Sequence, residues 1–227
     1  MSLWSRITAA LESLRAGEPL SAVFDRLRAP PERSVAFTIG VIALGAKLAK
    51  ADGTVTRDEV AVFRSVFTIP AAEERNAARI FDLARQDVAG FDAYARKIAG
   101  LFPPGDPVLR DLLEGLFHVA MADGRFHPAE EAYLRQVAEA FGLGERCFRV
   151  MIGRFVPGSE PDPYDMLELT PDADLDAARA AYRRLVRESH PDALRARGVP
   201  EEAVKLAEAR LKSLNRAWEE VRERAAA

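Results

Sequence analysis

Apolar residues recur at three- and four-residue intervals along most of the chain, the spacing that places them on one face of a helix. No segment shows the strict alternation of an amphipathic strand, so the sequence predicts an all-α protein. Helices are expected near residues 3–15, 19–27, 32–50, 57–68, 71–88, 91–102, 106–122, 128–141 and 144–155.

The clearest interruption of this pattern is the stretch VPGSEPDP, residues 156–163. Its three prolines and its Gly-Ser pair exclude a continuous helix and are typical of an exposed linker. We therefore expect two helical domains on either side of it. The expected boundaries are 1–31 for N-terminal amphipathic helices, 32–155 for a helical domain, 156–162 for the linker and 163–227 for a smaller domain.

Two apolar stretches near the N-terminus raise the question of membrane contact. The run 34–46 is shorter than the roughly 20 residues that cross a bilayer, which favours a buried core helix. Upstream, Trp4, Ile7, Leu11 and Leu14 share one face of an amphipathic helix. That face either packs on the domain, the usual role of such a helix, or docks on a membrane surface. No signal peptide and no transmembrane segment are expected.

An internal repeat lies within the larger domain. The segment AKADGTVTRDEVAVFRSVF, which starts at Ala49, aligns without gaps with AMADGRFHPAEEAYLRQVA, which starts at Ala120. In each copy the Ala-Asp-Gly is expected to end one helix, with the glycine in the left-handed conformation. The next helix begins with a capping box that includes Glu59 in the first copy, and at Pro128 with Glu130 in the second.

The repeat invites a calcium-site interpretation, which the individual positions test. The glycine, the apolar residue two positions later and the glutamate match positions six, eight and twelve of an EF-hand loop in both copies. Positions one and three, which must supply oxygen ligands, hold Leu48 and Lys50 in the first copy and Val119 and Met121 in the second. Neither copy is therefore an EF-hand, and helix capping accounts for both glutamates without a metal.

A second metal hypothesis rests on side chains around the second copy, namely His118, Asp123, His127, Glu130 and Glu131. These groups could meet at a divalent ion if the turn folded back. In the alternative interpretation, His127 caps a helix, His118 lies on a partly buried face and the acids are solvated. Because the fixed spacing of a metal-binding motif is absent, we predict no metal ligand and no cofactor.

The repeated Ala-Asp-Gly, followed by a glutamate at the head of the next helix, resembles the TerB-like family, an all-helical domain named for tellurite-resistance proteins. The resemblance covers about residues 32–155. It implies a helical scaffold with an acidic cluster, sometimes proposed to bind metal and made here of Asp52, Glu59, Asp123 and Glu130. It implies no known reaction.

The residues after the linker contain two apolar stripes at helical spacing. The first lies on a helix that is capped by Asp172 or Asp174 and ends near Glu188, and the second lies on a helix that starts near Pro200. Their members are Leu175, Ala178, Tyr182 and Leu185 in the first stripe and Val204, Ala207, Leu211, Leu214, Trp218 and Val221 in the second. Two such stripes predict an antiparallel helical hairpin with an apolar seam.

Four arginines on the first of these helices predict a basic surface. Arg179, Arg183 and Arg187 recur at every fourth residue, and Arg184 is adjacent to them. The whole chain carries 32 Lys+Arg against 35 Asp+Glu, a net charge of −3, so this surface is local and no nucleic-acid binding is expected. A small basic surface of this kind suits an acidic groove on a protein partner.

The tripeptide His190-Pro191-Asp192 follows the basic helix, and Pro191 ends that helix. As a nucleophilic or acid–base site it lacks a partner group, because no Gly-rich oxyanion loop is nearby and the single cysteine, Cys147, lies in the other domain. As a metal site it supplies too few ligands. We therefore predict a recognition tip that presents one carboxylate to an arginine of a partner. The lone cysteine also favours a reducing compartment.

These features resemble the J domain of DnaJ-type co-chaperones. PYDMLEL is similar to the family's opening D-Y-Y-x-L-G-L, AARAAYRRLVRESHPD to its basic helix and loop, and LKSLNRAWEEV to its closing x-x-I-N-x-A-Y-x-x-L, over residues 162–224. The resemblance implies that His190, Pro191 and Asp192 contact a DnaK-type chaperone, with the four arginines in support. Asp192 would pair with an arginine near the interdomain linker of that ATPase and accelerate its ATP hydrolysis. This chain would catalyse nothing itself.

Some features depart from the family pattern. Ala193 replaces the lysine that often follows the tripeptide, and the Gly/Phe-rich linker, C-x-x-C zinc module and β-rich client-binding segments are absent. A TerB-like domain before a J domain is similar to DjlA-type co-chaperones, which carry a transmembrane anchor that we do not expect here. We predict a cytoplasmic co-chaperone whose TerB-like domain is an adaptor for an unknown client. The alternative is a metal-responsive stress protein centred on the acidic repeat.

Overall fold

The computed structural model describes residues 3–12, 18–24, 32–51, 74–86, 90–103, 106–121, 124–159, 161–196 and 201–226. Within these ranges every regular element is a helix, which confirms the all-α prediction. None of the helices found there is long and apolar enough to span a membrane. The helix expected over 57–68 lies outside the described residues.

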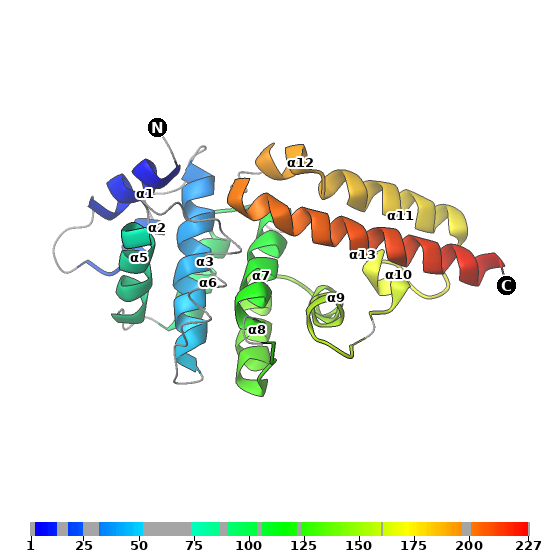
Figure 1. Cartoon of the computed structure of the whole chain (residues 1–227), viewed down its shortest axis with the longest axis horizontal. Helices are drawn as coiled ribbons and strands as arrows, with labels where there is room; N and C mark the ends of the chain where they lie inside the picture. The colour runs from blue at the N-terminus through cyan, green and yellow to red at the C-terminus, as the bar shows by residue number, and fades with distance from the viewer. Residues whose placement is uncertain are drawn as a thin grey trace.

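The first part of the chain forms an N-terminal bundle around α3 (Figure 1). The bundle contains α1 (Leu3–Glu12), α2 (Ser21–Phe24), α3 (Glu32–Ala51), α5 (Glu74–Gln86), α6 (Phe91–Ala99), α7 (Pro107–Ala120), α8 (Pro128–Ala140) and α9 (Glu145–Phe155). Helix α3 packs against α1, α5, α6, α7 and α8. Its residues from Val35 to Ala46 are all buried, because they are nearly all apolar and neighbours surround them. The apolar run is therefore a core helix.

Helix α1 packs its apolar face on this core. Ile7 and Leu11 are buried in the bundle, and the side-chain amide of Asn76 donates a hydrogen bond to the Thr8 hydroxyl at 2.9 Å. Two of the four apolar residues that could have docked on a membrane, Ile7 and Leu11, are therefore buried by protein contacts instead. The side chain of Trp4 and all of Leu14 lie outside the described residues.

The second copy of the repeat has the predicted turn. Helix α7 ends at Ala120, and Gly124 has a φ of 78°, a left-handed conformation that glycine adopts without a Cβ clash. Helix α8 then begins at Pro128, and the backbone N–H of His127 donates to the Glu130 carboxylate at 2.8 Å. Glu130 is therefore the predicted capping residue of this copy. The turn of the first copy lies outside the described residues.

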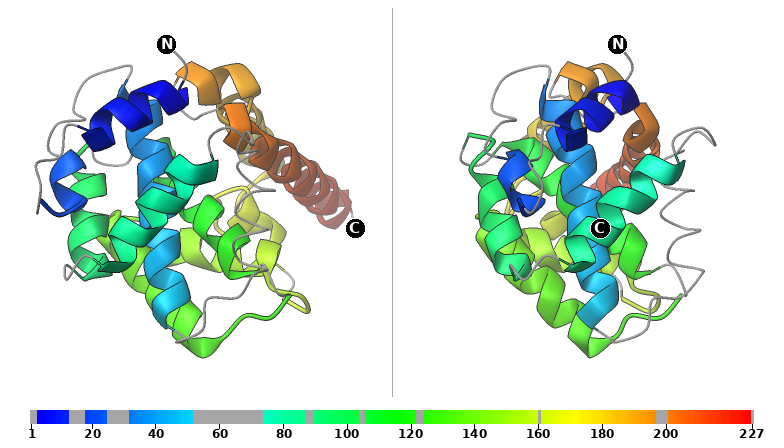
Figure 2. Two further views of the ribbon diagram at one scale, coloured as in Figure 1. Left: turned by 60° about the vertical axis from the view of Figure 1, so that its left-hand side comes forward. Right: turned by 90° about the vertical axis from the view of Figure 1, so that its left-hand side faces the viewer.

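The C-terminal part is the predicted helical hairpin. It contains α10 (Pro163–Met166), α11 (Leu175–Glu188), α12 (Pro191–Ala196) and α13 (Glu201–Ala226). Helices α11 and α13 lie side by side and extend away from the bundle, with the C-terminus at the far end (Figures 1 and 2). Its apolar core includes Met166, Leu167, Ala178, Leu185, Leu214, Ala217 and Val221.

One residue of the hairpin differs from the predicted stripes, and one of the two predicted caps is used. Leu175 is 37% exposed, because it is the first residue of α11 and lies at the edge of the seam. Ala181, which was not assigned to the stripe, is buried. Asp174, rather than Asp172, caps the helix by accepting a hydrogen bond from the Ala177 N–H at 2.7 Å.

The linker places the hairpin against α9. A Cβ at Gly153 would come within 2.8 Å of the Pro161 Cα, so glycine is required for this close approach. Asp162 then caps α10, because its carboxylate accepts a hydrogen bond from the Tyr164 N–H at 2.8 Å. Val150 of α9 packs on the hairpin core, whereas Leu194 of α12 joins the core of the N-terminal bundle. The hairpin therefore contacts the bundle through α10, α12 and the part of α13 around Arg210.

Candidate partner-binding site

The tripeptide His190-Pro191-Asp192 lies where α11 ends and α12 begins. The carbonyl of His190 accepts a hydrogen bond from the Leu194 N–H at 3.0 Å, which closes the first turn of α12. Proline and aspartate favour that first turn, since Pro191 has no N–H to satisfy and Asp192 complements the helix dipole. The sequence predicted the end of α11 but not the short helix that follows it.

Both polar side chains of the tripeptide point to solvent. The side chain of His190 is 59% exposed and that of Asp192 is 78% exposed. His190 Nδ1 accepts a hydrogen bond from the Asp192 N–H at 3.2 Å, and Arg195 Nη1 binds Asp192 Oδ1 at 2.7 Å. The carboxylate is thus presented on a helix start with one intramolecular cation beside it. This geometry suits recognition of a cationic group on a partner.

The four arginines of α11 do not form one uniform surface. Arg179, Arg183 and Arg187 are exposed, and Arg179 pairs with Asp176 at 3.2 Å. Arg184 differs, because its guanidinium group binds Glu168 at 2.6 Å and Glu188 at 3.4 Å. The single patch expected from the sequence is therefore divided, with Arg179, Arg183 and Arg187 on the exposed surface and Arg184 bound at the contact with the bundle.

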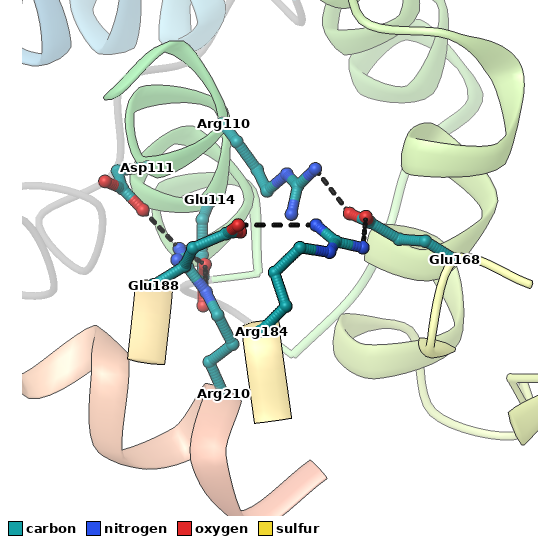
Figure 3. Close-up of polar contacts among 7 residues, drawn as sticks. All are labelled: Arg110, Asp111, Glu114, Glu168, Arg184, Glu188 and Arg210. Carbon is teal, nitrogen blue, oxygen red and sulfur yellow. Dashed lines mark hydrogen bonds and ion pairs between the residues drawn. The ribbon is translucent and has the colours of Figure 1, made fainter. Parts of the chain in front are cut away.

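A buried ion-pair network joins the hairpin to the bundle, and it was not foreseen from the sequence (Figure 3). Arg210 of α13 donates to Asp111 at 2.5 Å and through Nε to Glu114 at 2.9 Å, both on α7. Arg154 of α9 binds the other oxygen of Glu114 at 2.5 Å. The side chains of Arg210, Asp111 and Glu114 are at most 10% exposed. These contacts fix where α13 crosses α7.

The electrostatics of this network follow from its burial. Burial alone would raise the pKa of Glu114, but the guanidinium groups of Arg210 and Arg154 outweigh it and hold the pKa at about 2. Next to it, burial lowers the pKa of His118, with Glu114 acting in the opposite direction. The imidazole of His118 lies edge-on to the Phe155 ring at 4.6 Å. Glu114 is therefore ionised in the fold, and neutral imidazole is favoured at His118.

A second, more exposed set of ion pairs lies beside the buried one. Glu168, in the turn after α10, uses one carboxylate oxygen for Arg110 of α7 and the other for Arg184 of α11, each at 2.6 Å. Asp165 of α10 likewise binds Arg146 at 3.2 Å and Arg149 at 3.1 Å. Glu168 and Asp165 thus each bridge two arginines, at least one of which belongs to the bundle.

Between the two ion-pair sets lies a pocket of about 280 Å³. Its walls come from both parts of the chain, with Met151 and Cys147 of α9 opposite Met166, Leu185 and Leu214 of the hairpin. Burial raises the pKa of the Cys147 thiol above its ordinary value. The interface is therefore held mainly by charged contacts around an incompletely filled apolar centre.

The spacing of the apolar stripe on α13 could have indicated that Arg210 is buried. It falls between Ala207 and Leu214 at the three- and four-residue intervals of the apolar stripe, so a cation occupies a seam position. A charged residue at such a position requires a buried counter-ion. The identity of that counter-ion could not be read from the sequence, because Glu114 lies 96 positions away.

The acidic cluster implied by the TerB-like resemblance is only partly described. Glu130 is buried and caps α8, whereas Asp52, Glu59 and Asp123 lie outside the described residues. In the described part of the chain, no group of three or more His, Cys, Asp or Glu side chains is arranged to hold a metal ion.

Comparison with known proteins identifies two domains. The family model for tellurite resistance protein TerB matches residues 38–151, and the DnaJ domain model matches residues 162–225. The second match contains the tripeptide, the basic helix and Arg210.

Curated relatives match most of the chain. The chain is 26% identical to co-chaperone protein DjlA of Photobacterium profundum, over 84% of this chain and 78% of the relative. It is 29% identical to the protein of the same name from Coxiella burnetii, over 77% and 72% of the two chains. For that of Escherichia coli, the identity is 25% over 85% and 80%. No solved structure matches.

Proposed function

Because the chain belongs to the TerB family through residues 38–151 and carries a DnaJ domain over residues 162–225, we propose that it is a co-chaperone that binds a DnaK-type chaperone and stimulates its ATP hydrolysis. The observation that carries this proposal is the exposed tripeptide His190-Pro191-Asp192 at the start of α12, within the DnaJ domain. The named relatives are co-chaperones.

The chemistry around the tripeptide supports binding rather than catalysis by this chain. His190 and Asp192 are exposed to solvent, whereas a general acid or base acts on a substrate that is held within hydrogen-bond reach, usually in a pocket. Asp192 instead offers a carboxylate whose present cation, Arg195, is on the exposed surface. An arginine of the partner can displace Arg195 at little cost, because exposed ion pairs contribute only about 0.2–1 kcal/mol.

The remaining arginines of α11 supply the supporting charge. Arg179, Arg183 and Arg187 are exposed on the helix that leads to the tripeptide. They would attract an acidic groove on the chaperone and orient the hairpin as it approaches. Hydrolysis would then be accelerated in the partner, by the conformational change that docking of Asp192 favours there.

A single-turnover ATPase assay tests this proposal. The purified full chain is mixed with a DnaK-type chaperone loaded with ATP, and the hydrolysis rate is compared with that of the chaperone alone. We expect the full chain to raise the rate and Asp192→Asn to abolish the increase. Arg195→Gln serves as the matched control, since it removes the intramolecular cation and leaves the carboxylate available. Unchanged stimulation by Asp192→Asn, or none by the native chain, would contradict the proposal.

We further propose that the TerB-like domain, residues 32–155, acts as an adaptor that selects a client, and that the protein works in the cytoplasm. The buried contact of Arg210 with α7 supports such a division, because whatever binds the TerB-like domain is held in a fixed relation to the J domain. The full-length Asp192→Asn chain is the suitable bait, since its chaperone site is disabled. We expect this bait to capture client proteins from a lysate although it no longer binds the chaperone. If Asp192→Asn abolishes the capture of every protein that the native chain captures, the TerB-like domain is not an adaptor.

A further inference from the structure

Glu168 has an unusual backbone conformation. Its φ is 60°, and among the described residues it is the only non-glycine residue with a positive φ. In the J-domain pattern that this segment resembles, L-G-L, glycine stands at this position, and glycine adopts such a φ without strain. A side chain that keeps a strained conformation at a contact between two domains points to a function for that side chain.

The carboxylate of Glu168 connects the two domains. Its Oε1 binds Arg110 Nη2 of α7, and its Oε2 binds Arg184 Nη2 of α11, both at 2.6 Å (Figure 3). The three side chains are between 29% and 44% exposed, so the contacts are partly screened and can exchange. Arg110 belongs to the TerB-like domain, and Arg184 belongs to the basic helix of the J domain.

The two arginines compete for one charge. While Arg110 binds one oxygen, it offsets part of the carboxylate charge and leaves only the other oxygen for Arg184, so Arg184 is held less tightly. When Arg110 moves away, Glu168 can bind Arg184 with both oxygens, which is the stronger, bidentate arrangement. The other anion near Arg184 is Glu188, whose contact is longer, at 3.4 Å. Glu168 is therefore the main control on where Arg184 points.

We propose that Glu168 couples the TerB-like domain to the chaperone-binding helix, because contact with Arg110 leaves a single oxygen of Glu168 for Arg184, which is then held less tightly and can turn to an acidic surface of the partner. This inference rests on the proposed function and assigns a regulation to that same site. A ligand of the TerB-like domain that draws the Arg110 side chain away from Glu168 would let both carboxylate oxygens hold Arg184 and so weaken chaperone binding, while Arg210 keeps α7 itself in place. The TerB-like domain would thus act on the J domain as well as select clients.

Three single variants of the full chain test the coupling by chaperone affinity. Glu168→Gln keeps the backbone strain and removes the charge, so it should tighten binding by about two- to fivefold. Arg110→Gln leaves Arg184 as the single arginine bound to Glu168, so it should weaken binding by a similar factor. Glu220→Gln is the matched control, since it removes an exposed ion pair of α13 with Arg216 and should leave the affinity unchanged.

The opposite signs are the decisive feature. If the interface merely held the domains together, Glu168→Gln and Arg110→Gln would shift the affinity in the same direction, which would overturn the proposal, as would no shift in either. The double variant Glu168→Gln with Arg184→Gln should bind no more tightly than Arg184→Gln alone. A gain that survives loss of Arg184 also overturns the proposal.

A second measurement needs no chaperone. Hydrogen exchange of the Arg184 guanidinium group, followed by NMR in the full chain, should slow in Arg110→Gln and quicken in Glu168→Gln. If the native chain fails to stimulate any DnaK-type ATPase but these exchange rates diverge, the proposed function is wrong and the coupling stands. Equal exchange rates in the two variants overturn the coupling itself, whatever the ATPase assay shows.

Discussion

Arg210 of the J domain binds Glu114 of the TerB-like domain in a site where both side chains are buried, 8% and 0% exposed respectively. Burying these charges is costly, and their attraction offsets the cost only while both are present. The pair therefore contributes less to net stability than to fixing one relative position of the two domains. Because the interface holds these buried charges next to an incompletely filled pocket, single substitutions in it should change the stability of the chain.

Replacing Arg210 with methionine should destabilise the full chain by about 3–5 kcal/mol, because Asp111 and Glu114 would remain buried without the guanidinium group of Arg210. Urea unfolding of the variant and of the native chain gives the difference. Arg216→Met is the matched control on the same helix, since its ion pair with Glu220 is exposed, and it should change stability by less than about 0.5 kcal/mol. If the two substitutions changed the unfolding free energy equally, the buried contacts of Arg210 would contribute no more than an exposed ion pair.

Cys147 reports on the same interface. The chain has one cysteine, which lines the pocket between the domains, and burial raises the pKa of its thiol. A disulfide reagent should therefore label the native chain slowly at neutral pH, because thiolate is scarce and shielded. Arg210→Met should accelerate labelling by opening the contact, whereas Arg216→Met should not. Labelling that is equally slow in all three proteins would show that the pocket stays closed without Arg210.

Stability should fall in acid in two stages. The pKa of Glu114 is about 2 in the fold against an ordinary value of 4.5, so its contribution is complete above pH 4.5 and is lost as the pH falls toward 2. The difference corresponds to a loss on the order of 3 kcal/mol. The pKa of His118 is also lowered, mainly by burial, so the unfolded chain binds its proton first and stability starts to fall below pH 6.5.

Unfolding free energies measured from pH 7 down to pH 3 test both stages. His118→Gln should remove the decline that begins near pH 6.5 and keep the one below pH 4.5, whereas Glu114→Gln should make the lower one shallower and leave the part that comes from Glu168, whose pKa is also lowered by its two arginines. A single decline that neither substitution alters would show that other groups control the acid sensitivity.

The backbone strain at Glu168 can be separated from its charge. Glu168→Gly and Glu168→Gln both remove the carboxylate, but only glycine relieves the positive φ. We expect the glycine variant to be more stable than the glutamine variant by about 1 kcal/mol in thermal or urea unfolding. If the two variants unfolded at the same temperature or urea concentration, the positive φ at residue 168 would cost no measurable stability.

Local sequence patterns accounted for most of the fold. The apolar spacing located α3, α7, α8, α9 and the α11–α13 hairpin within a few residues, because each helix is selected by the face that it must bury. Capping residues such as Glu130 and Asp174 act on adjacent backbone groups, so their roles could also be predicted. The exposed tripeptide was recognisable for the same reason, since its three residues are consecutive.

The contact between the domains could not be predicted in this way. Arg210 and Glu114 carry no shared local pattern, and Arg184 looks equivalent to its three neighbouring arginines until Glu168 approaches it from another turn. The sequence by itself determined most of the helices, several of their caps and the position of the tripeptide at the end of α11, because short-range spacing controls all three. Only the tertiary structure decided which charges are buried together and which arginine of α11 is held by a carboxylate at the domain contact, since Coulomb interactions depend on distance in space and on desolvation.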